Sequence, residues 1–417
     1  PAEPFAALTE LKTDERVYYS TFNCWSEIAQ WYLNLTDNKH EQTYDIKTLA
    51  DSLTAGVTDS LEKVRKIHEY ITSTIRYSFI PFRQSGWIPQ PSMEVLSAKI
   101  GDCKDMSSLG KSLLNAAGIH SNLVLVDTRE QGAALPSYIG PNFNHCILSY
   151  TIGEEQEFID FTDKYNYLGS LPRAVQGSPA LVIKHGVNSL INLPQDSAHN
   201  RVLIRSVVSN IDSRGTLKRT VKSMRTGVHA GDYWANVWAM SSDEQKKDLQ
   251  RLLSAVFPRV VIDSMYAEGG EGIGDYVNSQ YSFTAVNGAQ FSGNNTALLD
   301  LDISDRIAPE HFPLESSRTQ DIDMTQLWFG IGTFELDGVL EFPSEWRLVN
   351  KPEDVKLAGQ WGHYSITFKL SGNKLDYSRR AVFNFHSPVA ASQSAELYAL
   401  FSKIIAADNV QLVFFKK

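Results

Sequence analysis

The sequence is poor in cysteine, and its cysteines follow no pairing pattern. Cys24, Cys103 and Cys146 are the three thiols in 417 residues, so they cannot all be joined in disulfides within the chain. None belongs to a Cys-x-x-Cys motif, and no two of the ten histidines lie four residues apart, as in a helical zinc site. No oxygen-rich loop has EF-hand spacing. The sequence therefore predicts neither a disulfide framework nor a metal, and it predicts no cofactor.

Long runs of one residue type are missing as well. The net charge is -9 and no basic run is present, which argues against a nucleic-acid surface. No apolar stretch reaches the roughly 18 residues of a membrane-spanning helix, so we expect no transmembrane segment. No signal peptide is recognisable after Pro1, and this leaves the cellular compartment open.

What is present is the composition of a soluble globular protein, with 42% hydrophobic and 21% charged residues. A chain of 417 residues exceeds one ordinary core, so two or three domains are expected. The pattern changes near Ala198, where a mixture of helices and strands gives way to mostly short strands. Helices are expected near 243–256 and 394–406. Strands are expected at 281–285, 297–303, 327–336, 363–370 and 379–386.

Cys103 lies at the start of a predicted helix. Apolar residues after it recur at steps of three and four, which is the spacing of one helix face: Met106, Leu109, Leu113 and Ala117. Asp102 is a candidate N-cap. Free backbone N–H groups and the helix dipole at this end favour a thiolate, the reactive form of cysteine. A packed core cysteine is the ordinary alternative, so the reactive interpretation needs partners elsewhere.

Two predicted strands downstream carry a histidine and an aspartate. Residues 145–150 and 157–161 flank Gly153 and read as a hairpin. If a two-residue turn closes the hairpin, the residue numbers of any two directly opposite residues add up to an odd number. Two residues whose numbers have an odd sum then point to the same face. His145 and Asp160 then share a face, directly opposite or diagonal, while Cys146 points away from them. This parity favours Cys103 over Cys146 as the functional thiol. A three-residue loop would reverse the parity.

A cysteine, a histidine and an aspartate are the parts of a thiol acyl-transfer site. The histidine takes the thiol proton or holds an imidazolium–thiolate pair, and the aspartate fixes its tautomer. The backbone N–H of Cys103 points out of the helix start and is a natural oxyanion donor. The sequence thus predicts Cys103, His145 and Asp160 as a candidate triad.

The motifs around these residues resemble those of bacterial transglutaminase-like domains, over roughly residues 55–185. They occur in the family's order with compatible spacing: Glu62-Lys63-Val64-Arg65-Lys66-Ile67, Ile75-Arg76-Tyr77, Gly101-Asp102-Cys103-Lys104-Asp105, Asn144-His145-Cys146-Ile147 and Phe158-Ile159-Asp160-Phe161-Thr162-Asp163. The resemblance implies a papain-like α+β core, in which a helix-borne cysteine packs on antiparallel strands with the histidine and aspartate. It assigns the matching triad to Cys103, His145 and Asp160.

The resemblance also suggests how the rest of the chain is organised. Residues 1–35 look like the remnant of an N-terminal module with a linker, 36–197 like the catalytic domain, and 198–417 like one or more β-rich C-terminal domains. In this superfamily an aromatic or amide side chain upstream of the cysteine often serves as a second oxyanion donor, and Trp87 or Gln90 could do so here. Trp87 fits equally as a cleft wall. The resemblance implies an exported protein, periplasmic or attached to the cell envelope.

We therefore expect an enzyme that transfers an acyl group from a peptide or protein amide through Cys103, with cell-wall peptide as a candidate substrate. With water as the acyl acceptor the enzyme is a cysteine protease or amidase, and with an amine it is a transglutaminase. The sequence shows no recognisable site for an acceptor lysine, which favours hydrolysis. The alternative is a catalytically silent scaffold, or an envelope protein whose β-rich part binds glycan or protein. The oligomeric state stays open.

Overall fold

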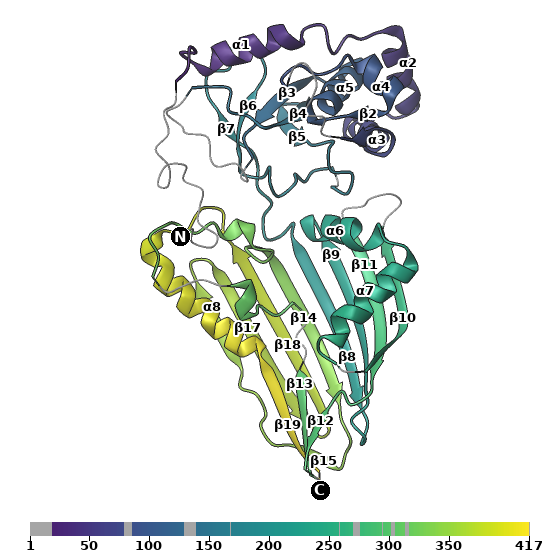
Figure 1. Cartoon of the computed structure of the whole chain (residues 1–417), viewed down its shortest axis with the longest axis vertical. Helices are drawn as coiled ribbons and strands as arrows, with labels where there is room; N and C mark the ends of the chain where they lie inside the picture. The colour runs from purple at the N-terminus through teal and green to yellow at the C-terminus, as the bar shows by residue number, and fades with distance from the viewer. Residues whose placement is uncertain are drawn as a thin grey trace. The chain divides into compact units, whose positions relative to one another are not determined.

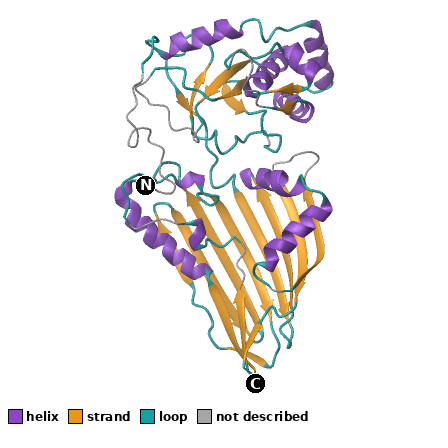
Figure 2. Cartoon of the chain, viewed as in Figure 1, coloured by secondary structure: helices purple, strands orange, loops and turns teal. Residues whose placement is uncertain are grey.

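The computed structural model describes residues 19–78, 86–128, 139–166, 168–257, 259–269, 276–293, 295–301, 305–312 and 317–416. These residues fall into two compact units that divide between Gln195 and Asp196, close to the boundary expected at residue 198. Figure 1 traces the elements of each unit and Figure 2 distinguishes helices from strands. The fold class is α+β, as predicted. None of the helices in the described ranges is both long and apolar enough to cross a membrane.

The first unit combines helices with a sheet in the order β5-β4-β3-β6-β7, in which each described neighbouring pair is antiparallel. Its helices are α1 (Trp25–Thr36), α2 (Tyr44–Leu53), α3 (Ser60–Thr74), α4 (Ser92–Ala98) and α5 (Cys103–Ala116). Its sheet strands are β3 (Ser121–Val126), β4 (His145–Ile152), β5 (Glu155–Ile159), β6 (Pro179–Val182) and β7 (Ile191–Asn192). The short strands β1 (Arg76–Tyr77) and β2 (Ile100–Gly101) pair in parallel and lead into α5.

The core of the first unit lies between α5 and one face of this sheet. The apolar stripe of α5, including Leu109 and Leu113, packs with Cys146 and Leu148 of β4. Because side chains alternate along a strand, Ile147 faces the opposite side and belongs to a second, smaller core. His145 is the first residue of β4, and its ring interacts with the side chain of Cys103 at the start of α5.

Helix α1 also contributes to the core of the first unit. Its buried residues Trp25, Ile28 and Tyr32 recur at steps of three and four and pack into the same cluster as α5. The sequence-based division had set residues 1–35 apart as the remnant of another module. The structure instead groups α1 with the core of the first unit, because its amphipathic stripe is buried there. The other boundaries of that division stay predictions.

The second unit is built on a sheet with the order β10-β11-β9-β8-β14-β18-β17-β16. Among its described pairs, β14 runs parallel to β8 and the others are antiparallel. Its strands are β8 (Val202–Ile211), β9 (Leu217–Thr226), β10 (Val260–Gly269), β11 (Tyr276–Ala285), β14 (Ile331–Glu341), β16 (Val355–Gly359), β17 (Gly362–Ser371) and β18 (Lys374–Asn384). A smaller sheet has the order β12-β13-β19-β15, with β12 (Gln290–Ser292), β13 (Thr296–Leu301), β15 (Trp346–Leu348) and β19 (Val410–Lys416).

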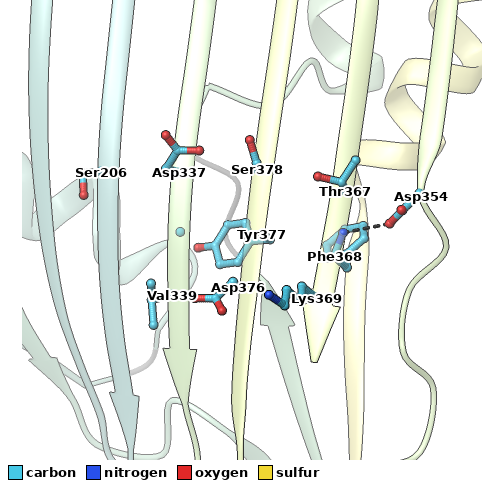
Figure 3. Close-up of a pocket in the computed structure, with 11 residues that line it drawn as sticks. Ser206, Asp337, Val339, Asp354, Thr367, Phe368, Lys369, Asp376, Tyr377 and Ser378 are labelled. Carbon is cyan, nitrogen blue, oxygen red and sulfur yellow. Dashed lines mark hydrogen bonds between the residues drawn. The ribbon is translucent and has the colours of Figure 1, made fainter. Parts of the chain in front are cut away.

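One face of the large sheet is covered and the other is open. Helices α7 (Ser242–Ser254) and α8 (Ser394–Asp408) share a core with its covered face and with the smaller sheet, while the short α6 (Val228–Tyr233) continues into a π-helical turn, Trp234–Trp238. The open face carries mostly polar side chains, as is common in antiparallel sheets. Figure 3 shows its middle, where Asp337, Thr367 and Asp376 line a hollow of about 440 Å³.

The expected elements of the second unit are largely confirmed. The strands predicted at 281–285, 363–370 and 379–386 overlap β11, β17 and β18, the strand at 297–303 overlaps β13, and the helices near 243–256 and 394–406 are α7 and α8. The strand predicted at 327–336 was placed too early, because residues 327–330 form a turn and β14 starts at Ile331. Gly330 permits this turn, since a Cβ there would lie 1.8 Å from the Met324 carbonyl oxygen.

Candidate active site

The sequence Gly101-Asp102-Cys103-Lys104-Asp105 forms the start of α5, which begins at Cys103 as predicted. The Asp102 carboxylate caps the helix by accepting the Asp105 N–H at 3.2 Å, and Asp105 in return accepts the Asp102 N–H at 3.1 Å. Lys104 forms an ion pair with Asp102. Gly101 is needed because a Cβ there would lie 2.9 Å from the Cβ of Asp105. This network fixes a free, half-buried thiol at the positive end of the helix dipole.

The histidine and the aspartate meet across a hairpin. Its register pairs Ile152 with Glu155, so Gly153 and Glu154 form a two-residue turn, and Gly153 has a φ of 63°. The predicted parity is therefore confirmed, and His145 and Asp160 are diagonal neighbours. His145 Nε2 lies 2.7 Å from Asp160 Oδ2. Asp160 Oδ1 accepts the N–H of Thr162 at 2.9 Å and its hydroxyl at 2.8 Å.

The electrostatics of this pair favour the charged forms of both side chains. Burial alone would lower the pKa of His145, but the Asp160 carboxylate and hydrogen bonds to Asp160 and Cys103 raise it from 6.5 to about 10. Burial would raise the pKa of Asp160, but attraction to His145 and hydrogen bonds from His145 and Thr162 lower it. At neutral pH the pair is thus an imidazolium bound to a carboxylate. Since Nε2 faces Asp160, the other ring nitrogen is the one left for Cys103.

Cys146 has the character of a core residue. Its side chain is buried and packs in the same cluster as Leu148, on the face that the predicted parity gave it. Burial raises the pKa of its thiol well above the ordinary value, and negative charge at Cys103 adds to this effect. A neutral, buried thiol is a poor nucleophile. Burial therefore distinguishes Cys146 from the half-buried Cys103.

His68 is a buried neighbour of Asp160. It lies on α3, is 6% exposed, and its ring centroid is 5.7 Å from that of Phe161. Burial lowers the pKa of His68 to about 4, against an opposing hydrogen bond with the Asp160 backbone. A neutral imidazole thus lies next to Asp160, the aspartate that is hydrogen-bonded to His145. No spacing pattern in the sequence links His68 to Asp160.

The two candidate oxyanion donors have different surroundings. Trp87 packs edge-on against Trp31, with ring centroids 5.6 Å apart, and against Tyr32 at 6.4 Å. Gln90 is joined to α5 instead. Its backbone N–H donates to Asp105 Oδ1 at 2.7 Å, and its side-chain Nε2 donates to Asp105 Oδ2 at 2.9 Å. Sequence reasoning missed Asp105, because contacts across a loop leave no spacing signal.

Tyr77 is a further neighbour of the candidate site. It belongs to β1 and is half exposed. Burial of its hydroxyl raises the pKa to about 12, and the negative charges of Cys103, Asp102 and Asp160 add to this effect. Its hydroxyl therefore stays protonated at neutral pH. Within the residues that the structure describes, no group of three or more His, Cys, Asp or Glu side chains is arranged to hold a metal ion.

Comparison with known proteins defines the class of the two units. The transglutaminase-like superfamily core matches residues 47–161, which include Cys103, His145 and Asp160. A domain of unknown function for which structures have been solved, DUF3858, matches residues 306–414. The chain thus contains a transglutaminase-like domain followed, on its C-terminal side, by a DUF3858 domain. No curated protein matches the chain significantly.

Two solved structures are similar to this chain to different extents. A suspected protease from Parabacteroides distasonis ATCC 8503 is similar over 95% of this chain, with a TM-score of 0.59 and 13% identity. This chain spans 59% of that protein's length. A suspected cysteine protease from Cytophaga hutchinsonii is 20% identical over 31% of this chain and 40% of its own. Its TM-score of 0.24 carries no structural argument.

Proposed function

We propose that this protein is a thiol-dependent acyl-transfer enzyme that hydrolyses an amide bond of a peptide or protein. One observation carries the proposal: the His145 ring is hydrogen-bonded to Asp160 through Nε2 and also interacts with the Cys103 side chain. A helix-terminal thiol, an imidazolium and a buried carboxylate in this order form a thiol nucleophile with its acid–base partner. The transglutaminase-like fold of this unit supports the same chemistry.

The proposed reaction has two steps. The Cys103 thiolate attacks the amide carbonyl carbon, and the C–N bond breaks as the His145 imidazolium gives its proton to the leaving amine. The thioester on Cys103 is then attacked by water, whose proton passes to His145, and the carboxylic acid leaves as Cys103 is restored. An amine in place of water gives transamidation. We favour water, because it needs no acceptor site.

The tetrahedral intermediates of both steps carry an oxyanion that needs hydrogen-bond donors. The backbone N–H of Cys103 is one candidate, since the first N–H groups of a helix have no partner within it. For the second donor we propose Gln90 rather than Trp87. Its carboxamide is bonded to the first turn of α5, whereas Trp87 packs in an aromatic cluster with Trp31 and Tyr32. Trp87 then acts as a wall of the site.

An amide-cleaving enzyme with a large β-rich second unit fits an envelope protein that acts on peptide, and cell-wall peptide is our candidate substrate. Peptide-library cleavage and amine-incorporation assays on the wild type and Cys103→Ala test the proposal. We expect cleavage by the wild type and none by Cys103→Ala. Cys24→Ala removes another free cysteine of the same unit and should keep full activity. Equal activity in Cys103→Ala would refute the proposal, and amine incorporation without cleavage would reassign it to transamidation.

A further inference from the structure

Asp105 is a buried carboxylate that joins two segments of the first unit. It is 0% exposed, and it lies in the first turn of α5. Its two oxygens accept the backbone N–H of Gln90, the side-chain Nε2 of Gln90 and the backbone N–H of Asp102. A buried carboxylate is costly unless donors of this kind compensate it. Gln90 is therefore held at two points by one side chain of the nucleophile helix.

The charge of Asp105 also decides which way the Gln90 carboxamide faces. An amide presents a carbonyl oxygen on one side and an NH₂ group on the other, and only the NH₂ group can donate to a carboxylate. One Nε2 hydrogen of Gln90 is used in this bond. Among the described residues the second has no partner, and the contact with Asp105 fixes its direction.

This contact keeps the Gln90 amide close to the residue that precedes Cys103. Gln90 Nε2 and the Asp102 nitrogen lie 2.9 and 3.1 Å from the same oxygen, Asp105 Oδ2, so they are at most about 6 Å apart. Asp102 directly precedes Cys103, whose backbone N–H is the other oxyanion donor. Glycine at position 101 leaves room for the Asp105 side chain, because a Cβ there would lie 2.9 Å from the Cβ of Asp105.

We propose that Asp105 is a positioning residue that holds Gln90 as the second oxyanion donor beside Cys103. This inference rests on the proposed acyl-transfer function and adds to it the device that fixes the donor. Asp105 does not itself contact the substrate. Its carboxylate sets the position and the orientation of the Gln90 amide before the substrate binds, so the donor needs no reorganisation during the reaction.

Two reactions of the same thiol separate this role from a merely structural one. Acyl transfer from p-nitrophenyl acetate to Cys103 passes through an oxyanion and releases p-nitrophenolate. Alkylation by iodoacetamide displaces iodide at a saturated carbon, so it forms no oxyanion and reports only on the thiol and His145. A lost oxyanion donor should therefore slow the first reaction and spare the second.

We expect Gln90→Ala and Asp105→Asn each to lower kcat/KM for the ester about 100-fold, and to change the alkylation rate of Cys103 by less than about twofold. Because both act on one donor, the double variant should be little slower than either single variant. Ser112→Ala is the matched control. It removes a buried hydrogen bond of α5, between Ser112 Oγ and Ser92 Oγ at 2.8 Å, and should leave ester turnover unchanged.

The inference fails if Gln90→Ala keeps wild-type ester turnover, if Asp105→Asn slows alkylation as much as turnover, or if the two effects multiply in the double variant. Should Asp105→Asn not fold, Asp105→Glu is measured in its place, because it keeps the charge but moves it by one methylene, and the same expectations apply. Failure of the proposed function is distinguishable: the wild type would then form no acyl group on Cys103.

Discussion

Replacing Asp160 by Asn tests the electrostatics of the candidate site. In the folded protein the pKa of His145 is raised from 6.5 to about 10, with Asp160 as the main cause. A net shift of this size corresponds to ~5 kcal/mol in favour of the protonated imidazole. Solvent screens the pair little, since the side chains are 14% and 1% exposed. We expect the variant to lose on the order of 2–5 kcal/mol of stability near pH 6, because such buried pairs lose much of their attraction to desolvation.

The loss should depend on pH in a defined direction. A group whose pKa is raised by folding stabilises the fold fully below its unfolded pKa, here 6.5, and loses this effect as the pH rises to about 10. The free-energy cost of Asp160→Asn should therefore be largest near pH 6 and should shrink steadily towards pH 10. Urea denaturation of the variant and the wild type across this range measures it.

Asp212→Asn is the control for this experiment. Asp212 accepts the backbone N–H groups of Arg214 and Thr216 in an exposed turn, so no histidine titration is coupled to it. The free-energy cost of Asp212→Asn should be constant from pH 6 to 10. A cost of Asp160→Asn that is equally constant, or that grows with pH, would show that His145 and Asp160 are not the charged pair described above.

Three further predictions concern packing, buried charge and thiol reactivity. Gly110→Ala should destabilise the first unit by ~1–3 kcal/mol in thermal unfolding, although alanine favours helices, because its Cβ would lie 2.4 Å from the Phe161 ring; a stabilised variant would contradict this. Arg379→Met should cost ~3–5 kcal/mol, because it leaves the Asp408 carboxylate buried without its 2.7 Å ion pair, whereas the exposed Arg214→Met should cost less than about 0.5 kcal/mol. Iodoacetamide at neutral pH should label Cys103 before Cys146, and His145→Ala should suppress this selectivity; peptide mapping that finds equal, slow labelling of all three cysteines would favour the silent scaffold.

Local patterns in the sequence were enough to locate the elements of the candidate site. The apolar stripe after Cys103 predicted α5, and Asp102 was recognised as its cap. The two-residue turn at Gly153 fixed the side-chain parity of β4 and β5, and with it the proximity of His145 and Asp160. Both inferences succeed because a helix period and a hairpin register depend on residues close in sequence.

Contacts between distant segments could not be predicted in this way. Asp105 reaches Gln90 across a loop and another helix, and His68 reaches Asp160 from α3. Nothing in the spacing of these residues reports either contact. The parallel pairing of β14 with β8 is of the same kind, since many residues separate the two strands. Helix α2 is hard to predict for another reason: its buried positions Ile46 and Ala50 are few, and polar residues surround them.

The formation of an acyl-enzyme on Cys103 is the event on which the proposed function depends, and mass spectrometry detects it directly. The wild type, Cys103→Ala and Cys24→Ala are mixed with p-nitrophenyl acetate, quenched in acid and mapped by peptide. We expect one acetyl group on the peptide that contains Cys103 in the wild type and in Cys24→Ala, and none on the corresponding peptide of Cys103→Ala. A wild-type protein that carries no acetyl group on Cys103, or that is acetylated equally at all three cysteines, would contradict the proposed thiol chemistry.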